Sequence, residues 1–161
     1  MPEESNPENG QLAQQWLNLL DGSLRLGAVV ELPVLSNSML PVFGMGRKIK
    51  IRREAWKSCR CGDIIVFRVG GRLMAHRLLF VMRMGRRRYF YQKGDANPTG
   101  HFIRAERVVG RVVGYRDETN GYRSLCTRAA RQAGRVAALK QLLRILWRTV
   151  RRVLDRIQRK A

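Results

Sequence analysis

The middle of the chain carries the clearest structural pattern, and residues 63–93 read DIIVFRVGGRLMAHRLLFVMRMGRRRYFYQK. Three runs rich in β-branched, aromatic and other apolar residues are separated by Gly70-Gly71 and by Gly85. A Gly-Gly pair between two such runs is typical of a two-residue hairpin turn, and a single glycine suits a second reversal. The stretch therefore predicts antiparallel strands over residues 63–69, 73–84 and 87–93.

Shorter runs of the same kind lie on both sides of this stretch. They predict further strands over residues 27–35, 48–52 and 108–115. We therefore expect a mainly β fold, with an antiparallel β domain over residues 25–118. The preceding residues 1–24 form an N-terminal segment, in which residues 11–20 could form one short helix.

Length and composition limit the class of protein. With 161 residues, 45% hydrophobic and 27% charged, the chain is the size of one folded domain, too apolar for a disordered protein and too polar for a membrane bundle. No uninterrupted apolar run exceeds five residues, and the acidic start lacks the order of a secretory signal. We expect a cytoplasmic protein with peripheral membrane association.

Cysteine and charge usage add further expectations. The three cysteines do not suggest a disulfide framework, and the pair Cys59 and Cys61 lacks the second pair of a zinc site. We predict neither a metal nor a cofactor. The net charge of +20 makes a polyanion, either nucleic acid or an anionic membrane surface, a serious candidate partner.

The C-terminal residues 119–161 have a composition of their own. Residues 123–161 contain twelve Lys and Arg and one Asp, so they carry 12 − 1 = +11 of the total charge. Apolar residues recur there at steps of three and four, which places them on one stripe of a helix: Val136, Leu139, Leu143, Leu146, Val150, Val153 and Ile157. We predict a basic amphipathic helical tail.

Three kinds of partner fit such a helix. The apolar stripe can lie in the interface of an anionic membrane, where each basic residue adds about 1 kcal/mol. Alternatively, the helix packs on a partner protein or on the β domain, or it forms a basic arm that binds nucleic acid. We favour the membrane surface.

The segment Ser36-Asn37-Ser38-Met39-Leu40-Pro41 is the strongest functional motif, because it places two hydroxyl groups one residue apart at the end of an apolar strand. Four other motifs follow it along the chain: Gly62-Asp63-Ile64-Ile65-Val66-Phe67, Ala75-His76-Arg77-Leu78-Leu79, Lys93-Gly94-Asp95 and Val108-Val109-Gly110-Arg111-Val112. In this order, over residues 34–115, they resemble the type I signal peptidases and the related self-cleaving repressors.

The resemblance implies a β-rich fold and a role for each motif. Ser38, in the Ser-Met dipeptide, would be the nucleophile, and Ser36 would help its backbone N–H to form the oxyanion hole. The base is Lys in the usual bacterial signal peptidases and the repressors. Here His76 stands at that place before Arg77, as in the archaeal and endoplasmic-reticulum branch, so the resemblance implies a Ser-His enzyme.

The chemistry of these residue types agrees with those roles. A serine hydroxyl attacks a peptide carbonyl only when a nearby base takes its proton, and an imidazole can return that proton to the leaving amine. In an alternating strand His76 shares a face with Met74, Leu78 and Phe80. We therefore expect the imidazole to face the core or a cleft wall.

A carboxylate on the other ring nitrogen would orient the imidazole. Asp95 is the candidate. The His-containing branch usually has a second Asp several residues later, where this chain has Pro98, Thr99, Gly100 and His101. The third catalytic member therefore stays open, and Asp95 could equally be a turn residue.

The resulting hypothesis is a serine endopeptidase that cleaves a peptide or precursor protein after small residues at a membrane surface. The resemblance implies that the substrate lies extended beside residues 27–35. Residues 25–35 are too short and polar for the membrane anchor that typical signal peptidases carry before the nucleophile, so the basic helix would replace it. A non-catalytic nucleic-acid-binding module and a self-cleaving regulator are the alternatives.

Overall fold

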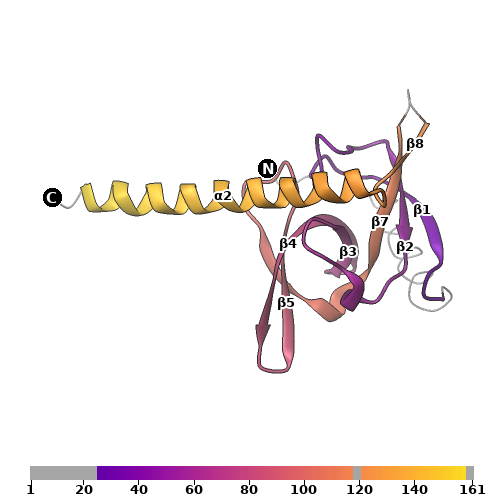
Figure 1. Ribbon diagram of the computed structural model, residues 1–161, viewed down its shortest axis with the longest axis horizontal. Helices are drawn as coiled ribbons and strands as arrows, with labels where there is room; N and C mark the ends of the chain where they lie inside the picture. Colours follow the sequence, from indigo (N-terminus) through magenta and orange to yellow (C-terminus); the bar gives the residue numbers. More distant parts are fainter. Residues whose placement is uncertain (1–24, 118–120, 159–161) are drawn as a thin grey trace.

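The computed structural model describes residues 25–117 and 121–158, without the side chains of residues 153, 154 and 157. The helix expected over residues 11–20 lies outside these ranges. The described part consists of a curled antiparallel sheet with one long helix across it (Figure 1).

The sheet has eight strands, and every recorded strand pair is antiparallel. The order across it is β1-β2-β7-β3-β4-β5-β6, and β8 pairs with β7. The mainly β fold is thus confirmed. The strands are β1 (Val29–Pro33), β2 (Lys48–Arg52), β3 (Ile64–Val69), β4 (Arg72–Met84), β5 (Arg87–Lys93), β6 (His101–Arg104), β7 (Val108–Asp117) and β8 (Gly121–Ser124).

The turns between β3, β4 and β5 are the predicted hairpins. Gly70, Gly71 and Gly85 have φ values of 55°, 73° and 59°, in the region that side chains adopt rarely and that these tight reversals require. Two strands were not predicted. Strand β6 is a four-residue edge strand and β8 is fully exposed, so neither shows a strong apolar alternation.

The core lies on both faces of the sheet, because successive residues of β3 point to opposite sides. Ile64 and Val66 pack in one cluster, with Met39, Phe43 and Ile51 among its members. Ile65 and Phe67 belong to the other cluster, whose further members are Cys59, Leu78, Phe90, Ile103, Ala105 and Val108. Strand β3 is therefore central and is buried along most of its length.

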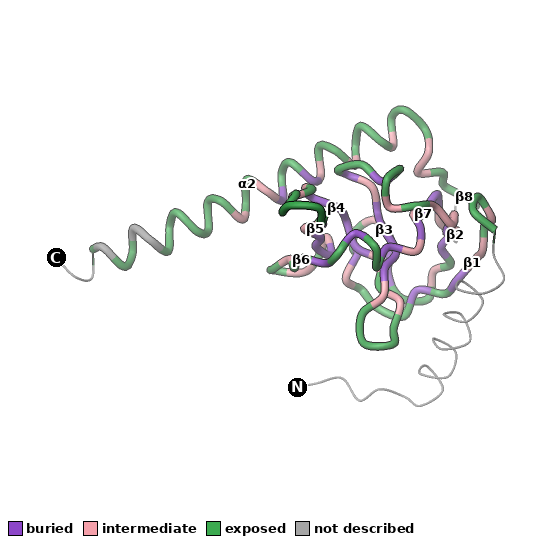
Figure 2. The backbone as a smooth tube through the Cα atoms, turned by 90° about the horizontal axis from the view of Figure 1, so that it is seen from below, coloured by how far each residue is buried: buried purple, intermediate pink, exposed green. Residues whose placement is uncertain are grey.

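Helix α2 (Arg128–Gln158) packs against β4 through a face of small residues and one glutamine. Ala138 and Gln141 are buried. A Cβ on Gly134 would lie 2.7 Å from the Gly62 carbonyl oxygen, so the two backbones touch at a point that admits only glycine. Figures 1 and 2 show that the C-terminal half of α2 extends beyond the sheet.

The predicted helical tail begins later than residue 119, because residues 121–124 form β8. The apolar stripe does not face the β domain. Its members Val136, Leu139, Leu143, Leu146 and Val150 are between 43% and 60% exposed. The helix therefore packs on the β domain with one face and leaves its apolar face open.

Candidate active site

The segment that contains the two serines forms a turn after β1. Met39 is only 1% exposed and fixes the turn to the core. The Asn37 Oδ1 atom accepts a hydrogen bond from the Met45 backbone N–H at 2.9 Å, so this side chain shapes the turn. Ser36 is exposed and Ser38 half-buried, and their hydroxyl oxygens lie 3.2 Å apart. The structure thus brings together the two hydroxyl groups that the sequence singled out.

This turn rests on the loop that follows β5. The Ser38 carbonyl oxygen accepts a hydrogen bond from the Ala96 backbone N–H at 2.9 Å. A Cβ on Gly94 would come within 2.7 Å of the same oxygen, so a side chain at residue 94 would push the two segments apart. The nucleophile candidate is therefore held next to the loop that contains Asp95.

His76 lies on β4 and is 5% exposed. Its Nδ1 atom lies 2.6 Å from Oε1 of Gln92 on β5. Because a carbonyl oxygen only accepts hydrogen bonds, Nδ1 carries the hydrogen and Nε2 is left as the acceptor. The ring also packs against Phe67, with 5.8 Å between the ring centroids. Neighbouring strands therefore fix the orientation of the imidazole.

The pKa of His76 is lowered from its ordinary value, chiefly because burial disfavours the charged ring. The hydrogen bond that His76 donates to Gln92 and the charge of Asp95 act in the opposite direction, while His101 and Lys93 add to the lowering. The imidazole is consequently neutral near pH 7, which is the form that can accept a proton.

The strand register relates His76 to Ser38. Arg77 pairs with Lys93, so His76 is adjacent to the end of β5, where Gly94 meets the Ser38 carbonyl group. Within the described ranges, Ser38 Oγ and His76 do not hydrogen-bond to each other; the recorded partners are Ser36 and Gln92. Catalytic hydrogen bonds are often long before substrate binds.

Asp95 lies differently from our expectation. Its carboxylate accepts hydrogen bonds from Arg77 Nε at 2.8 Å and Arg77 Nη2 at 2.5 Å, and also from Gln141 Nε2 of α2. Gln92 occupies the His76 nitrogen that Asp95 was expected to bind. The carboxylate therefore acts on His76 through its charge rather than through a hydrogen bond, because three donor atoms, two of Arg77 and one of Gln141, already hold it.

Sequence reasoning missed Gln92 and Gln141, and it did not predict that Lys93 is buried. Lys93 Nζ donates to the Gly94 carbonyl and to Gln141 Oε1, both at 3.1 Å, and burial lowers its pKa. In strand alternation Gln92 and Lys93 face opposite sides of β5. Strand β5 ends in the polar pair Gln92-Lys93, and no local pattern shows that these side chains are buried or that a distant helix contacts Lys93.

The cysteines form no metal site in the part of the chain that is described, where no cluster of His, Cys, Asp and Glu could hold a metal ion. Cys59 is buried, and burial raises the pKa of its thiol to about 12. The thiol is therefore protonated and belongs to the core cluster around Phe67.

The chain matches no protein-family model, and a search of curated proteins found no match.

Proposed function

We propose that this chain is a serine endopeptidase of the signal-peptidase kind, with Ser38 as the nucleophile and His76 as the general base. The observation that carries the proposal is a hydroxyl pair, Ser36 and Ser38, held against the loop beside a buried neutral imidazole. Such an imidazole can take the Ser38 proton during attack on a peptide carbonyl and return it to the leaving amine.

Ser36 suits the role of oxyanion donor. A tetrahedral intermediate places negative charge on the former carbonyl oxygen, which needs hydrogen-bond donors fixed in advance. The Ser36 hydroxyl lies 3.2 Å from Ser38 Oγ. It is therefore close to the carbonyl group that Oγ would attack, whose oxygen would become negatively charged. Asp95 would stabilise the imidazolium through its charge, and Gln92 would keep Nε2 free for the serine proton.

Strand β1 supports an extended peptide as the substrate. It is at one end of the described sheet, where β2 is its only recorded partner. An added strand could pair with its open edge and lead directly to the serine turn, because β1 ends at Pro33. Cleavage after small residues remains an expectation from the family resemblance.

An anionic membrane surface is the proposed location of the reaction. No described helix is long and apolar enough to span a bilayer. However, Leu139, Leu143, Leu146 and Trp147 are all at least 56% exposed on α2, and the helix also carries several arginines. An exposed apolar face bordered by cationic residues fits the interface of an anionic leaflet.

Proteolysis of Ala-x-Ala peptides tests the proposal. Wild-type protein should cleave the peptide after the second Ala, and Ser38→Ala and His76→Ala should remove this activity. Ser124→Ala is the matched control, because it removes an exposed serine hydroxyl on β8, away from the serine turn. Equal turnover by all the proteins would contradict the proposal, as would no turnover by the folded wild type.

A basic nucleic-acid-binding module is the second candidate, favoured by the net charge of +20. Its affinity for duplex or single-stranded nucleic acid would fall steeply as salt is added. A self-cleaving regulator would instead cut its own chain at a rate independent of protein concentration. Binding to nucleic acid that persists in a tail-deleted chain, without peptidase activity, would favour the module.

A further inference from the structure

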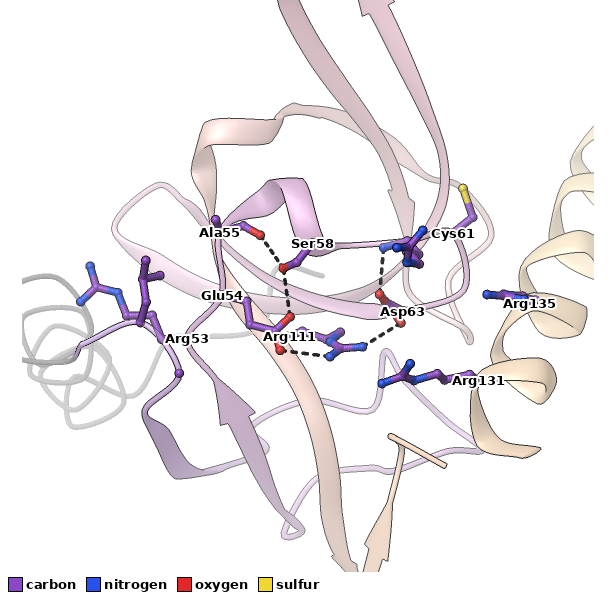
Figure 3. Close-up of a pocket in the computed structure, with 12 residues that line it drawn as sticks. Arg53, Glu54, Ala55, Ser58, Cys61, Asp63, Arg111, Arg131 and Arg135 are labelled. Atoms are coloured by element: carbon purple, nitrogen blue, oxygen red, sulfur yellow. Dashed lines mark hydrogen bonds and ion pairs between the residues drawn. The ribbon is translucent and has the colours of Figure 1, made fainter. Parts of the chain in front are cut away.

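A pocket of about 440 Å³ lies between the first turns of α2 and the segment that leads into β3 (Figure 3). It is separate from the serine turn, because neither Ser36 nor Ser38 lines it. Its lining carries two carboxylates, Glu54 and Asp63, and five arginines, so its formal charge is 5 − 2 = +3. The arginines are Arg53, Arg60, Arg111, Arg131 and Arg135.

Both carboxylates already have partners. Arg111 lies between them, with Nη2 3.0 Å from Glu54 and Nη1 3.5 Å from Asp63. Glu54 also accepts a hydrogen bond from the Ser58 hydroxyl at 3.1 Å, and Asp63 accepts one from the Arg60 backbone N–H at 2.8 Å. Arg111 and these two acids therefore form the base of the pocket, with a formal charge of 1 − 2 = −1.

Arg131 and Arg135 add two positive charges, one more than the base of the pocket balances. They are exposed, one helical turn apart, and both extend from α2 toward Asp63 and Arg111 (Figure 3). Neither forms a hydrogen bond or ion pair through its side chain within the described residues. The contact between Gly62 and the Gly134–Arg135 backbone fixes this part of α2 against the loop. The two guanidinium groups are thus held at the pocket without an anionic partner.

We propose that this pocket binds a phosphate-type oxyanion through Arg131 and Arg135. Guanidinium groups donate paired hydrogen bonds whose geometry matches phosphate oxygens, and a phosphate can accept from two arginines at once. A monovalent carboxylate would leave more of the charge unbalanced. The pocket volume also admits a substituent on the phosphate.

Two sources share this chemistry: free inorganic phosphate and the phosphate headgroup of a lipid. Titration calorimetry of the full chain with inorganic phosphate tests the first. A short-chain anionic phospholipid below its micelle concentration tests the second. Saturable binding of either probe that depends on Arg131 and Arg135 supports the proposal, and the tighter probe identifies the source.

The matched comparison uses two double variants of α2. Arg131→Gln/Arg135→Gln removes the pocket charges, whereas Arg151→Gln/Arg152→Gln removes the same charge from the exposed distal part of the same helix. We expect the first to weaken binding of the tighter probe at least about tenfold and the second to change it less than about twofold.

Three results would overturn the proposal: no saturable binding of either probe to the wild type, equal weakening in both double variants, or full binding in Arg131→Gln/Arg135→Gln. The circular dichroism spectrum of each variant verifies that α2 is retained. Ser38→Ala should bind the probe as the wild type does, so failure of the peptidase proposal and failure of this one give different results.

Discussion

His76 and Gln92 form the contact on which the proposed chemistry depends most. Their 2.6 Å hydrogen bond gives the imidazole one tautomer, although Gln92 has no negative charge with which to stabilise an imidazolium. A neutral orienter therefore fixes geometry but favours proton uptake less than a carboxylate would. The charge of Asp95 favours the imidazolium, although Arg77 and Gln141 hold the carboxylate oxygens.

The pH dependence of kcat/KM should show this arrangement. Burial lowers the pKa of His76, so the acid limb of the wild-type profile should have its midpoint below the ordinary value of about 6.5. Gln92→Glu would place a carboxylate against the ring, raise the pKa of His76 and move the acid limb to higher pH. Initial rates of peptide cleavage from pH 4 to 9 measure both.

Gln92→Leu is the control for that substitution. Loss of the hydrogen bond removes an interaction that raises the pKa of His76, so the limb should move further down and kcat should fall at least about tenfold. The free energy of unfolding of the wild type and of Gln92→Leu should also fall as the pH drops below 6.5, because His76 then binds a proton more readily in the unfolded chain than in the folded one. Circular dichroism at each pH separates this effect from catalysis. Identical acid limbs in all three proteins would exclude His76 as the base.

Helix α2 is linked to the β4–β5 hairpin and its following loop by buried hydrogen bonds. Gln141 contacts both Lys93 and Asp95, and Asp95 holds Arg77, whose Nη1 atom donates to the Gly62 carbonyl at 2.8 Å. Arg77 follows His76 on β4, and Lys93 follows Gln92 on β5. Docking of the helix therefore stabilises the end of β5 next to His76.

Gln141→Leu tests this coupling between elements. The substitution leaves two buried partners, Lys93 and Asp95, each without one hydrogen bond, which should lower the free energy of unfolding by about 1–3 kcal/mol. It should also lower kcat more than it changes KM, because the hairpin behind His76 loosens. Lys140→Leu removes an exposed neighbour on the same helix and should change both quantities little. Urea unfolding and peptide kinetics of both variants measure these quantities. Equal changes in the free energy of unfolding and in kcat in Gln141→Leu and Lys140→Leu would contradict the coupling.

The sequence predicts elements where a local pattern exists. The Gly70-Gly71 pair requires positive φ values and marks the β3–β4 hairpin, and strand alternation places His76 on the same face as Leu78 and the ring of Phe67. The apolar residues of α2 lie along one stripe, as their spacing predicts. The spacing does not show that this stripe is exposed. Gly134, Ala138 and Gln141 form the packing face, and their role depends on Gly62 and Asp95, which are distant in sequence.

In the candidate active site, too, only contacts between residues close in sequence could be predicted. Ser36 and Ser38 are neighbours, so their chain order alone brings the hydroxyls together. The partner of Asp95 could not be predicted, because Arg77 and the carboxylate meet only after β4 and β5 pair and α2 docks. Gln92 was missed because an uncharged amide within a β strand carries no catalytic signature of its own.

At the scale of the whole molecule, charge and exposed apolar surface coincide on α2. The protein carries +20, and the helix extends past the sheet with its apolar residues open (Figure 2). An anionic bilayer would satisfy both features at once, since apolar burial and charge attraction act together at an interface.

Vesicle co-sedimentation tests this surface. Leu143→Ser/Leu146→Ser/Trp147→Ser should weaken binding to anionic vesicles at least about tenfold, because each exposed apolar side chain that enters the interface contributes about 1.5–3 kcal/mol when fully buried. Val81→Ser/Met84→Ser removes exposed apolar residues from the β4–β5 hairpin and serves as the control. Added salt should weaken wild-type binding. Equal binding to neutral and anionic vesicles would exclude the proposed electrostatic contribution.

Trapping the acyl-enzyme measures the central chemistry most directly. An Ala-x-Ala ester is mixed with the protein, the reaction is stopped with acid, and mass spectrometry locates the added acyl group. We predict acylation of Ser38 in the wild type, none at that residue in Ser38→Ala, and a strong reduction in His76→Ala. Absence of an adduct in rapidly quenched wild-type protein, or undiminished acylation of Ser38 in His76→Ala, would contradict it.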